Sequence, residues 1–412
     1  MTSPRQTFTL ARAFDLVETL LTKYTLACPL LERATVAGGL RRFEPIVDEL
    51  IVVGCAAEPE AVIDMLARLP DTGTILERTP RRLLLLLHQQ AAIDVRITAL
   101  DEYGTVLHSA TGSPEHVAAV TARRPRVRLC AREEDVFAAA GLSFIPPELR
   151  HNTGEIEAAA TGQLPALIEP EQIRGDLHMH STYSDGQDSL ATMVAAAAAL
   201  GYEYIAITDH SERAGAARTV SPDDLERQRE DIERLRERHP SMAILHGIEV
   251  DIMPDGRLDF DDDLLASLDI VLASLHDDAG QSAKGLTQRC LKAIAHPLVS
   301  IVTHPANQIV GRRPGYALDF EAVYEAARET GTALEIDGAP SHMDLDGEHA
   351  REAVGAGATV VIDSDAHRAG ALARHMRFGV GTARRGWVEA RHVLNTRSLA
   401  EVRRFIDKKR SG

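Results

Sequence analysis

YEYIAITDH (residues 202–210) and TVVIDSDAH (359–367) each run from a short apolar segment straight into acidic and histidine side chains. Further apolar runs in the second half of the chain end in the same way, and segments with helical periodicity separate them. Regular alternation of strand and helix is typical of a parallel sheet buried on both faces. We count roughly seven such strands and therefore expect a (β/α) barrel. The helical segments are 188–200, 221–238, 261–268, 283–296, 319–330 and 347–356.

The side chains at the ends of these predicted strands are candidate metal ligands. A parallel barrel delivers the C-terminal ends of its strands to one rim, where residues distant in sequence meet. Neutral imidazole and carboxylate groups hold Zn²⁺, Mn²⁺ or Fe²⁺. They outnumber the ligands of one ion, which predicts a site with several ions that activates water against a phosphoester. The candidates are His178, His180, Asp185, His210, Glu249, His276, His304, Asp365 and His367.

Composition limits the class of protein. With 412 residues, 44% of them hydrophobic and 26% charged, the chain is expected to form two or three globular domains. Its net charge of −16 argues against a broadly basic nucleic-acid binder, so any contact with DNA would use local arginines and metal ions. Cys28, Cys55, Cys130 and Cys290 form no C-x-x-C pair, which predicts buried thiols in a reducing cytoplasm. Neither a signal peptide nor a membrane span is predicted, and no membrane partner is expected.

The first hundred residues read as a small mixed α/β unit. Helical periodicity covers residues 10–24 and 58–69, and residues 47–54 have the pattern of a strand. From Leu83 the sequence predicts two strands around a turn at His88-Gln-Gln. Helical pieces surrounding an arginine-rich strand, Arg123 to Arg132, follow before a proline pair breaks the chain.

Motifs in the second half resemble the PHP domain, named for polymerase and histidinol phosphatase. They are GDLHMHSTYSDG (175–186), ITDHS (207–211), GIEVDI (247–252), ASLH (273–276), THP (303–305) and DSDAH (363–367). Three further motifs look like the PHP domain at the C-terminus of bacterial family X DNA polymerases: GRR (311–313), FGVGTARRGW (378–387) and VLNTR (393–397). This resemblance implies a seven-stranded distorted barrel with a trinuclear metal site. It also implies phosphoester cleavage, typically as a Mn²⁺-dependent 3′–5′ exonuclease, sometimes with 3′-phosphatase or abasic-site endonuclease activity.

Carried over by position, the resemblance assigns ligands to three divalent ions, with Mn²⁺ favoured for activity over Zn²⁺ or Fe²⁺. The first ion would be held by His178, His180, Glu249 and Asp365. Glu249 would bridge to a second ion held by His276 and His304, and the third would be held by Asp185, His210 and His367. We expect catalysis to depend on Glu249, His276 and Asp365. Substrate phosphate is expected at Arg312, Arg313, Arg384 and Arg385, for which ordinary surface ion pairs are the alternative.

The front half resembles the palm of the same polymerase family in GGLRR (38–42), IVDELIVV (46–53), IDVRI (93–97) and TGSPEH (111–116). The family's Asp-x-Asp pair aligns with Glu49 and Ile51, so only the third aspartate, Asp94, remains. Nucleotidyl transfer needs several carboxylates around two ions, and isoleucine cannot be a ligand. We therefore expect polymerisation to be lost. The palm would persist either as a DNA-positioning or dimerising module or as a vestigial structural domain.

These patterns divide the chain into four predicted parts. They are a degenerate palm-like domain (1–112), a shortened thumb-like region (113–150), a linker (151–174) and a PHP phosphoesterase domain (175–412). The smaller front part would be an α+β nucleotidyltransferase-like fold. Candidate contacts to the DNA backbone are Arg123, Arg124, Arg126 and Arg128, with a strand edge protected by charge as the alternative.

Three functions remain open from the sequence. The first is metal-dependent 3′–5′ exonuclease or 3′-end processing activity on DNA, which the attached palm favours. The second is a phosphatase for small phosphoesters, similar to histidinol-phosphate phosphatase, which the acidic charge favours. Asp277 and Asp278, directly after His276, and the Asp337 to His342 segment add negative charge beside the site and favour the same reading. The third is a non-catalytic DNA-repair scaffold, against which the full ligand set argues.

Overall fold

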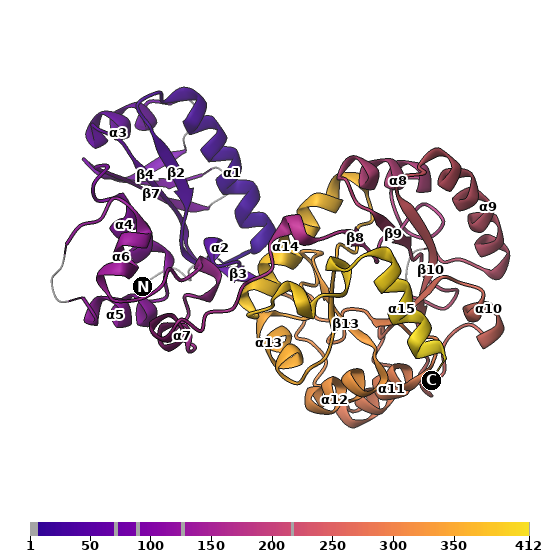
Figure 1. The fold of residues 1–412 in the computed structure, drawn as a ribbon. Helices are drawn as coiled ribbons and strands as arrows, with labels where there is room; N and C mark the ends of the chain where they lie inside the picture. Colours follow the sequence, from indigo (N-terminus) through magenta and orange to yellow (C-terminus); the bar gives the residue numbers. More distant parts are fainter. Residues whose placement is uncertain (1–6, 70–72, 88–90, 125–127, 216–217, 412) are drawn as a thin grey trace. The chain divides into compact units, whose positions relative to one another are not determined.

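The chain forms two compact units, Met1–Leu164 and Pro165–Gly412 (Figure 1). The computed structural model describes residues 7–69, 73–87, 91–124, 128–215 and 218–411. The segment 151–174, predicted as a linker, contributes to both units, because helix α7 (Glu155–Thr161) belongs to the first and Ile168 is buried in the core of the second.

The first unit is built on a five-stranded sheet in the order β2-β4-β7-β6-β5. The central pair, β4 and β7, is parallel, and the other neighbours are antiparallel. The strands are β2 (Arg33–Val36), β4 (Leu50–Cys55), β5 (Thr74–Thr79), β6 (Arg82–Leu86) and β7 (Ala92–Thr98), beside a small ladder of β1 (Phe8–Thr9) and β3 (Ile46–Val47). The predicted strand pair around residues 88–90 is confirmed as β6 and β7, while the turn itself lies outside the described residues.

The helices of the first unit agree with the predicted helical segments at 10–24 and 58–69. They are α1 (Leu10–Ala27), α2 (Gly38–Arg41), α3 (Pro59–Ala67), α4 (Tyr103–Thr111), α5 (Pro114–Ala122), α6 (Glu133–Ala139) and α7. Helices α3 and α5 begin with a proline at their first position. A backbone N–H at this position has no partner within the helix, so the N–H that proline lacks costs no hydrogen bond.

The arginine-rich strand predicted at Arg123–Arg132 is wrong for the part of this segment that the structure describes. Residues 128–132 have no strand partner and instead cover the start of α4. The backbone N–H groups of Gly104 and Thr105 donate to Ala131 O and Cys130 O. A side chain on Gly104 would collide with the Arg132 backbone, with a Cβ only 2.1 Å from its carbonyl carbon, so glycine permits this close approach.

The second unit contains a seven-stranded parallel sheet in the order β14-β13-β12-β11-β10-β9-β8. A parallel bridge between Met179 and Ala366 joins the segments that follow the two edge strands, so the sheet is nearly closed. The predicted (β/α) barrel is therefore confirmed. Its strands are β8 (Gly175–Asp176), β9 (Tyr204–Ile207), β10 (Ala243–Asp251), β11 (Ile270–Ser274), β12 (Ile301–Val302), β13 (Ala333–Asp337) and β14 (Val360–Asp363).

Most helices of the second unit begin at serine or aspartate caps. Six of them have an N-cap side chain that accepts a backbone N–H from the first turn, which satisfies a donor without a helical partner. The caps are Ser189, Ser221, Asp261, Ser282, Asp319 and Asp346. The helices of this unit are α8 (Leu190–Ala199), α9 (Pro222–Arg238), α10 (Asp262–Ala266), α11 (Ala283–Ala295), α12 (Phe320–Thr330), α13 (Gly347–Gly355), α14 (Leu372–Arg385) and α15 (Leu399–Arg410).

Alternation along the strands places the candidate ligands above an apolar floor. One buried cluster takes residues from or directly after every barrel strand, among them Leu245, Ala333 and Val361, together with Val402 and Ile406 of α15. Side chains at i and i+2 of a strand face the same side. The positions that follow this apolar layer on the same face include Glu249, Glu335 and Asp363, all fully buried. The apolar layer thus fills the barrel, and its polar layer lies toward the C-terminal rim.

Glu249 differs from the expectation that every ligand follows its strand. Strand β10 continues to Asp251, and Glu249 pairs with Leu272 inside the ladder. A backbone bridge between His210 and Glu249 extends the pairing on the other side. The carboxylate is consequently held by sheet on both flanks rather than by a loop.

None of the helices in the described part of the chain combines the length and the apolar composition that crossing a membrane requires.

The close packing of α14 on the end of β13 gives a prediction about stability. A Cβ on Gly338 would lie 2.0 Å from His375 O of α14, and backbone cannot yield as a flexible side chain does. We expect Gly338→Ala to lower the free energy of unfolding by about 1–3 kcal/mol through overpacking. The fluorescence of Trp387, the one tryptophan of the chain, would follow denaturation of this unit.

Gly355→Ala at the end of α13 is the matched control, since a Cβ there meets nothing within 4 Å. Equal denaturation midpoints for Gly338→Ala and Gly355→Ala would contradict the packing described.

Candidate metal centre

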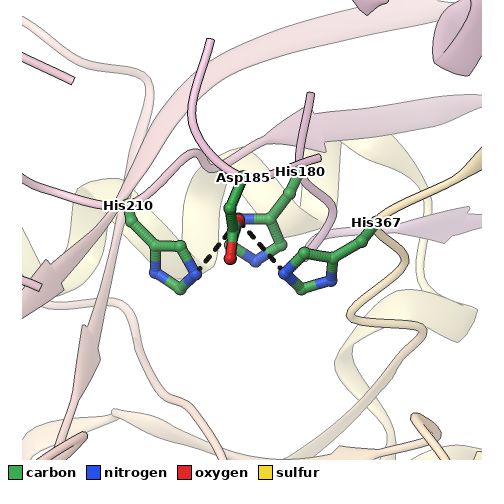
Figure 2. Close-up of side chains that lie close together, drawn as sticks. All are labelled: His180, Asp185, His210 and His367. Carbon is green, nitrogen blue, oxygen red and sulfur yellow. Dashed lines mark ion pairs between the residues drawn. The ribbon is translucent and has the colours of Figure 1, made fainter. Parts of the chain in front are cut away.

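The structure brings the nine predicted ligands together at the C-terminal rim of the barrel. Figure 2 shows one group, His180, Asp185, His210 and His367, with their side chains turned toward one another. Two further groups are His178, His180 and Asp365, and His210, Glu249 and His276. Within each group the donor atoms lie within 4.8 Å of one another, the range expected of ligands that share an ion.

Glu249 lies at the centre of the site. Its Oε2 is 2.8 Å from His210 Nδ1, and its Oε1 is 2.9 Å from His304 Nε2 and 3.4 Å from His276 Nε2. Thr303 Oγ1 also donates to Oε1 at 3.0 Å. Each oxygen of Glu249 contacts different imidazoles. Glu249 is fully buried, so these contacts are out of reach of solvent.

Asp365 and Asp185 complete the arrangement on either side. Asp365 Oδ1 lies 3.0 Å from His180 Nε2 and 3.6 Å from His178 Nε2. Asp185 Oδ1 lies 3.3 Å from His367 Nε2 and 3.5 Å from His210 Nε2, the two pairs marked in Figure 2. Three carboxylates are thus distributed among six imidazoles.

Hydrogen bonds fix the orientation of several imidazoles. His178 Nδ1 is 2.7 Å from Glu335 Oε1, His276 Nδ1 is 2.7 Å from Asp251 Oδ1, and His367 Nδ1 is 3.0 Å from Asp365 O. Because carboxylates and carbonyls only accept, these Nδ1 atoms donate and leave Nε2 with a free lone pair facing the cluster. Metal-ligating histidines are held in this way.

Glu335 and Asp251 are therefore functional residues that the sequence reasoning missed. Glu335 accepts from His178 with one oxygen and from the His304 backbone N–H with the other, at 2.7 Å each. The signal that could have found it is its place two residues after Ala333, on the inward face of β13. Asp251 has the same relation to Glu249 on β10.

The donor set fits divalent metal ions. Several buried atoms of the predicted ligands have no hydrogen-bond partner among the described residues: His180 Nδ1, Asp185 Oδ1, His210 Nδ1, Glu249 Oε2 and His304 Nδ1. Buried polar atoms without partners are rare because desolvation is costly. Imidazole nitrogen and carboxylate oxygen in this number suit Zn²⁺, Mn²⁺ or Fe²⁺.

The electric field at the site is that of an uncompensated anion cluster. Burial by itself would lower the pKa of His276, but the Glu249 and Asp251 carboxylates together outweigh it and raise that pKa to about 10. Burial likewise opposes the charge on Asp185, yet the hydrogen bond with His367 and the charges of His210, His367 and His180 together lower the pKa of Asp185 to about 2. A field that holds protons on imidazoles also attracts cations that replace those protons.

Asp209 has a supporting role behind the ligands. It accepts from the backbone N–H groups of Ser181 and Ser184, at 2.8 and 3.1 Å, and from Gln228 Nε2 at 2.6 Å. These contacts fix the loop that carries Asp185. Two ligands have backbone in the left-handed region, His304 with φ 26° and Asp365 with φ 44°. Such backbone strain at a non-glycine residue is tolerated where the surrounding structure fixes the conformation. It could not be predicted from the sequence pattern.

The four arginines predicted to bind phosphate have different environments. Arg312 is exposed, whereas Arg313 donates to Asn307 O at 2.8 Å and lies over the Tyr316 ring. Arg384 donates to Ile168 O at 2.8 Å and pairs with Glu169. The Arg385 Cβ packs against Gly347 of α13. Binding of phosphate by Arg312, Arg313, Arg384 and Arg385 stays a prediction.

In the first unit, Asp94, the aspartate that the resemblance to a palm retains, is engaged by arginines. Arg82 Nε lies 2.8 Å from Asp94 Oδ1, and Arg96 Nη2 lies 2.8 Å from Asp94 Oδ2. Ile51 is the neighbour of Asp94 in the β4–β7 register, and Glu49 is exposed just before β4. Both carboxylate oxygens of Asp94 therefore already have cationic partners.

The arginines of the GGLRR segment are paired as well. Arg41 forms a double contact with Glu133, at 3.0 and 2.7 Å, and Arg150 also binds this buried glutamate. Arg42 pairs with Glu44. Of the arginines proposed for the DNA backbone, Arg123 and Arg128 are exposed and Arg124 donates to Arg128 O; Arg126 lies outside the described residues.

Comparisons with known proteins give one family match and several similar proteins. A family model described as the PHP domain matches residues 176–335. The chain is 36% identical over 389 residues to the DNA polymerase/3′-5′ exonuclease PolX of Bacillus subtilis, a match that covers 90% of this chain and 68% of that protein.

Two phosphatases are also similar to parts of the chain. A probable phosphatase of Caldanaerobacter subterraneus subsp. tengcongensis is 34% identical over 178 residues, 40% of this chain and 65% of that protein. The structure of histidinol phosphate phosphatase from Lactococcus lactis subsp. lactis matches with a TM-score of 0.42 and 18% identity, over 52% of this chain and 93% of that chain.

The role of Glu335 can be tested by metal affinity. Glu335→Gln keeps the size of the side chain but cannot accept from both His178 and the His304 backbone. We expect metal affinity to fall about 10- to 100-fold, the usual cost of losing a residue that orients a ligand. Competition of Zn²⁺ between the protein and a chelating dye measures it, with exposed Glu325→Gln of α12 as control. Unchanged metal affinity in Glu335→Gln would show that Glu335 does not orient the ligands of the site.

Proposed function

Because the chain belongs to the family of the DNA polymerase/3′-5′ exonuclease PolX, we propose that it is a Mn²⁺-dependent exonuclease that removes nucleotides from the 3′ ends of DNA and has lost polymerase activity. The family and its PHP domain make the chain a metal-dependent hydrolase. The observation that best supports the finer proposal is the convergence of imidazoles on both oxygens of Glu249.

The proposed ligand assignment follows the groups at the rim. His178, His180, Glu249 and Asp365 would hold one ion, Glu249, His276 and His304 a second, and Asp185, His210 and His367 a third. Bound divalent ions lower the pKa of a water molecule and neutralise phosphate charge, which is the chemistry they would supply here. Glu249 holds two of the groups together, and Glu335 and Asp251 keep His178 and His276 in their binding orientation.

The protein itself would bind and orient the phosphoester. No serine or cysteine nucleophile is needed, since water is the attacking group in this chemistry. Exposed Arg312, on the loop after the His304 strand, is available to bind a phosphate oxygen. We propose that residues 1–112 and 113–150 are the palm-like and thumb-like parts that position DNA. All four cysteines are buried and free, which agrees with work in the reducing cytoplasm.

The second candidate function is hydrolysis of small phosphoesters. Similarity to probable phosphatases and the net charge of −16 favour it. The two substrates are compared directly with purified protein, Mn²⁺, a 3′-labelled oligonucleotide and a panel of sugar and amino-alcohol phosphates. We expect stepwise release of nucleotides from the oligonucleotide at a higher kcat/KM than any of the small phosphates. Turnover of a small phosphate alone would replace the exonuclease proposal with the phosphatase.

The bridging position of Glu249 predicts unequal effects of two ligand substitutions. Glu249→Ala removes contacts to three imidazoles, whereas His367→Ala removes a ligand of the outer group only. At saturating Mn²⁺ we expect the rate of His367→Ala to exceed that of Glu249→Ala by roughly tenfold or more. A tenfold difference corresponds to about 1.4 kcal/mol in activation free energy. Exposed Glu348→Ala is the control. Equal residual rates for Glu249→Ala and His367→Ala would contradict the bridging role.

Loss of polymerase activity predicts that primers are not extended. Ile51 stands at a ligand position, and Arg82 and Arg96 neutralise Asp94. We expect no template-directed incorporation with Mg²⁺ or Mn²⁺, measured in the Glu249→Ala background so that exonuclease activity cannot mask extension. Extension that a further Asp94→Ala substitution eliminates would show that the palm is active.

A further inference from the structure

A fourth group of donors adjoins the nine ligands, shares Asp365 with them and adds two side chains that are not among the nine. Asp337, His342 and Asp365 have donor atoms within 4.8 Å of one another. Asp337 ends β13, and His342 belongs to the loop between β13 and α13. The His342 ring stacks on the ring of His304, which follows β12, with centroids 5.1 Å apart. The group therefore lies between His304 and Asp365, which follows β14.

Asp337 provides a buried carboxyl group at this place, and its pKa is raised well above the usual value by burial and by the neighbouring Asp365 and Glu335 carboxylates. It is fully buried, and its Oδ1 accepts from the Ala339 backbone N–H at 2.5 Å. Its Oδ2 has no hydrogen-bond partner among the described residues. Asp365 and Glu335 add two more buried carboxylates nearby. An unpaired buried carboxylate is strongly unfavourable, and a cation is one of the few groups that can compensate several at once.

His342 is oriented as the ligand histidines are. Its Nδ1 lies 3.0 Å from Gln308 O, a carbonyl that only accepts, so Nδ1 donates and Nε2 keeps its lone pair. His178, His276 and His367 show the same fixation of Nδ1. The side chain is partly exposed, unlike that of the buried Asp337.

We infer that Asp337, His342 and Asp365 form an additional binding position for a divalent cation, separate from the three ions of the proposed centre. Two carboxylates and one imidazole suit Mn²⁺, Zn²⁺ or Fe²⁺. With only three protein donors, this position would bind a cation more weakly than the nine-ligand centre and would leave coordination positions for water or a phosphate oxygen of the substrate. The inference rests on the proposed function in one respect, since Asp365 is shared with the first ion.

The experiment counts bound Mn²⁺ by equilibrium dialysis and elemental analysis, from substoichiometric to millimolar Mn²⁺, without substrate. The variants are Asp337→Asn, which keeps shape but removes the charge, and His342→Phe, which keeps a ring to stack on His304. His349→Phe is the matched control, an aromatic-stacked histidine of α13 whose ring packs on Phe320. Thermal unfolding confirms that each variant is folded.

We expect the wild type and His349→Phe to reach a plateau one ion higher than Asp337→Asn and His342→Phe, with the tightly bound ions unchanged. Equal plateaus in all four proteins would overturn the inference. Loss of an ion in Asp337→Asn but not in His342→Phe would overturn it too, as would loss of two or more ions in both. A tightly bound count other than three would contradict the proposed centre, while the difference of one ion would still support the additional position.

Discussion

The burial of the Glu249 carboxylate among imidazoles is the interaction on which the second unit depends. An anion out of reach of water is stable only where positive charge or hydrogen-bond donors surround it. The barrel supplies His210, His276 and His304 around this one group, each from a different strand end. The same requirement explains Glu335 and Asp251, which orient the imidazoles, and Asp209, which fixes the loop of Asp185.

The two units neutralise their buried carboxylates in different ways. In the barrel, imidazoles face the carboxylates, and the protons that they hold can be replaced by cations from solution. In the first unit, Asp94 and Glu133 already have guanidinium partners, Arg82 and Arg96 for the former and Arg41 and Arg150 for the latter. Arginine is always charged and cannot be displaced as a proton can. The buried carboxylates of the first unit are thus held by internal ion pairs rather than by groups that a cation can replace.

The barrel could be predicted from the sequence because its information is local. Apolar runs, capping residues and helical periodicity recur with a regular spacing, and a ligand at the end of each run marks the rim. Glu335 and Asp251 could not be identified in the same way, since their roles depend on which imidazole they reach across the barrel. Asp337 and His342 approach Asp365 only through the path of the β13–α13 loop. The strand expected at Arg123–Arg132 failed because packing against α4 outweighs the local pattern in the residues described.

The central claim is that the nine side chains of the barrel rim constitute one metal centre. Elemental analysis of metal-replete protein after exhaustive dialysis tests it most directly, because retention of ions does not depend on which substrate is chosen. Nine imidazole and carboxylate ligands, one of them bridging, predict about three tightly bound divalent ions per chain. One ion or none would contradict the account, since Glu249 and its imidazoles would then lack the cations that their arrangement requires.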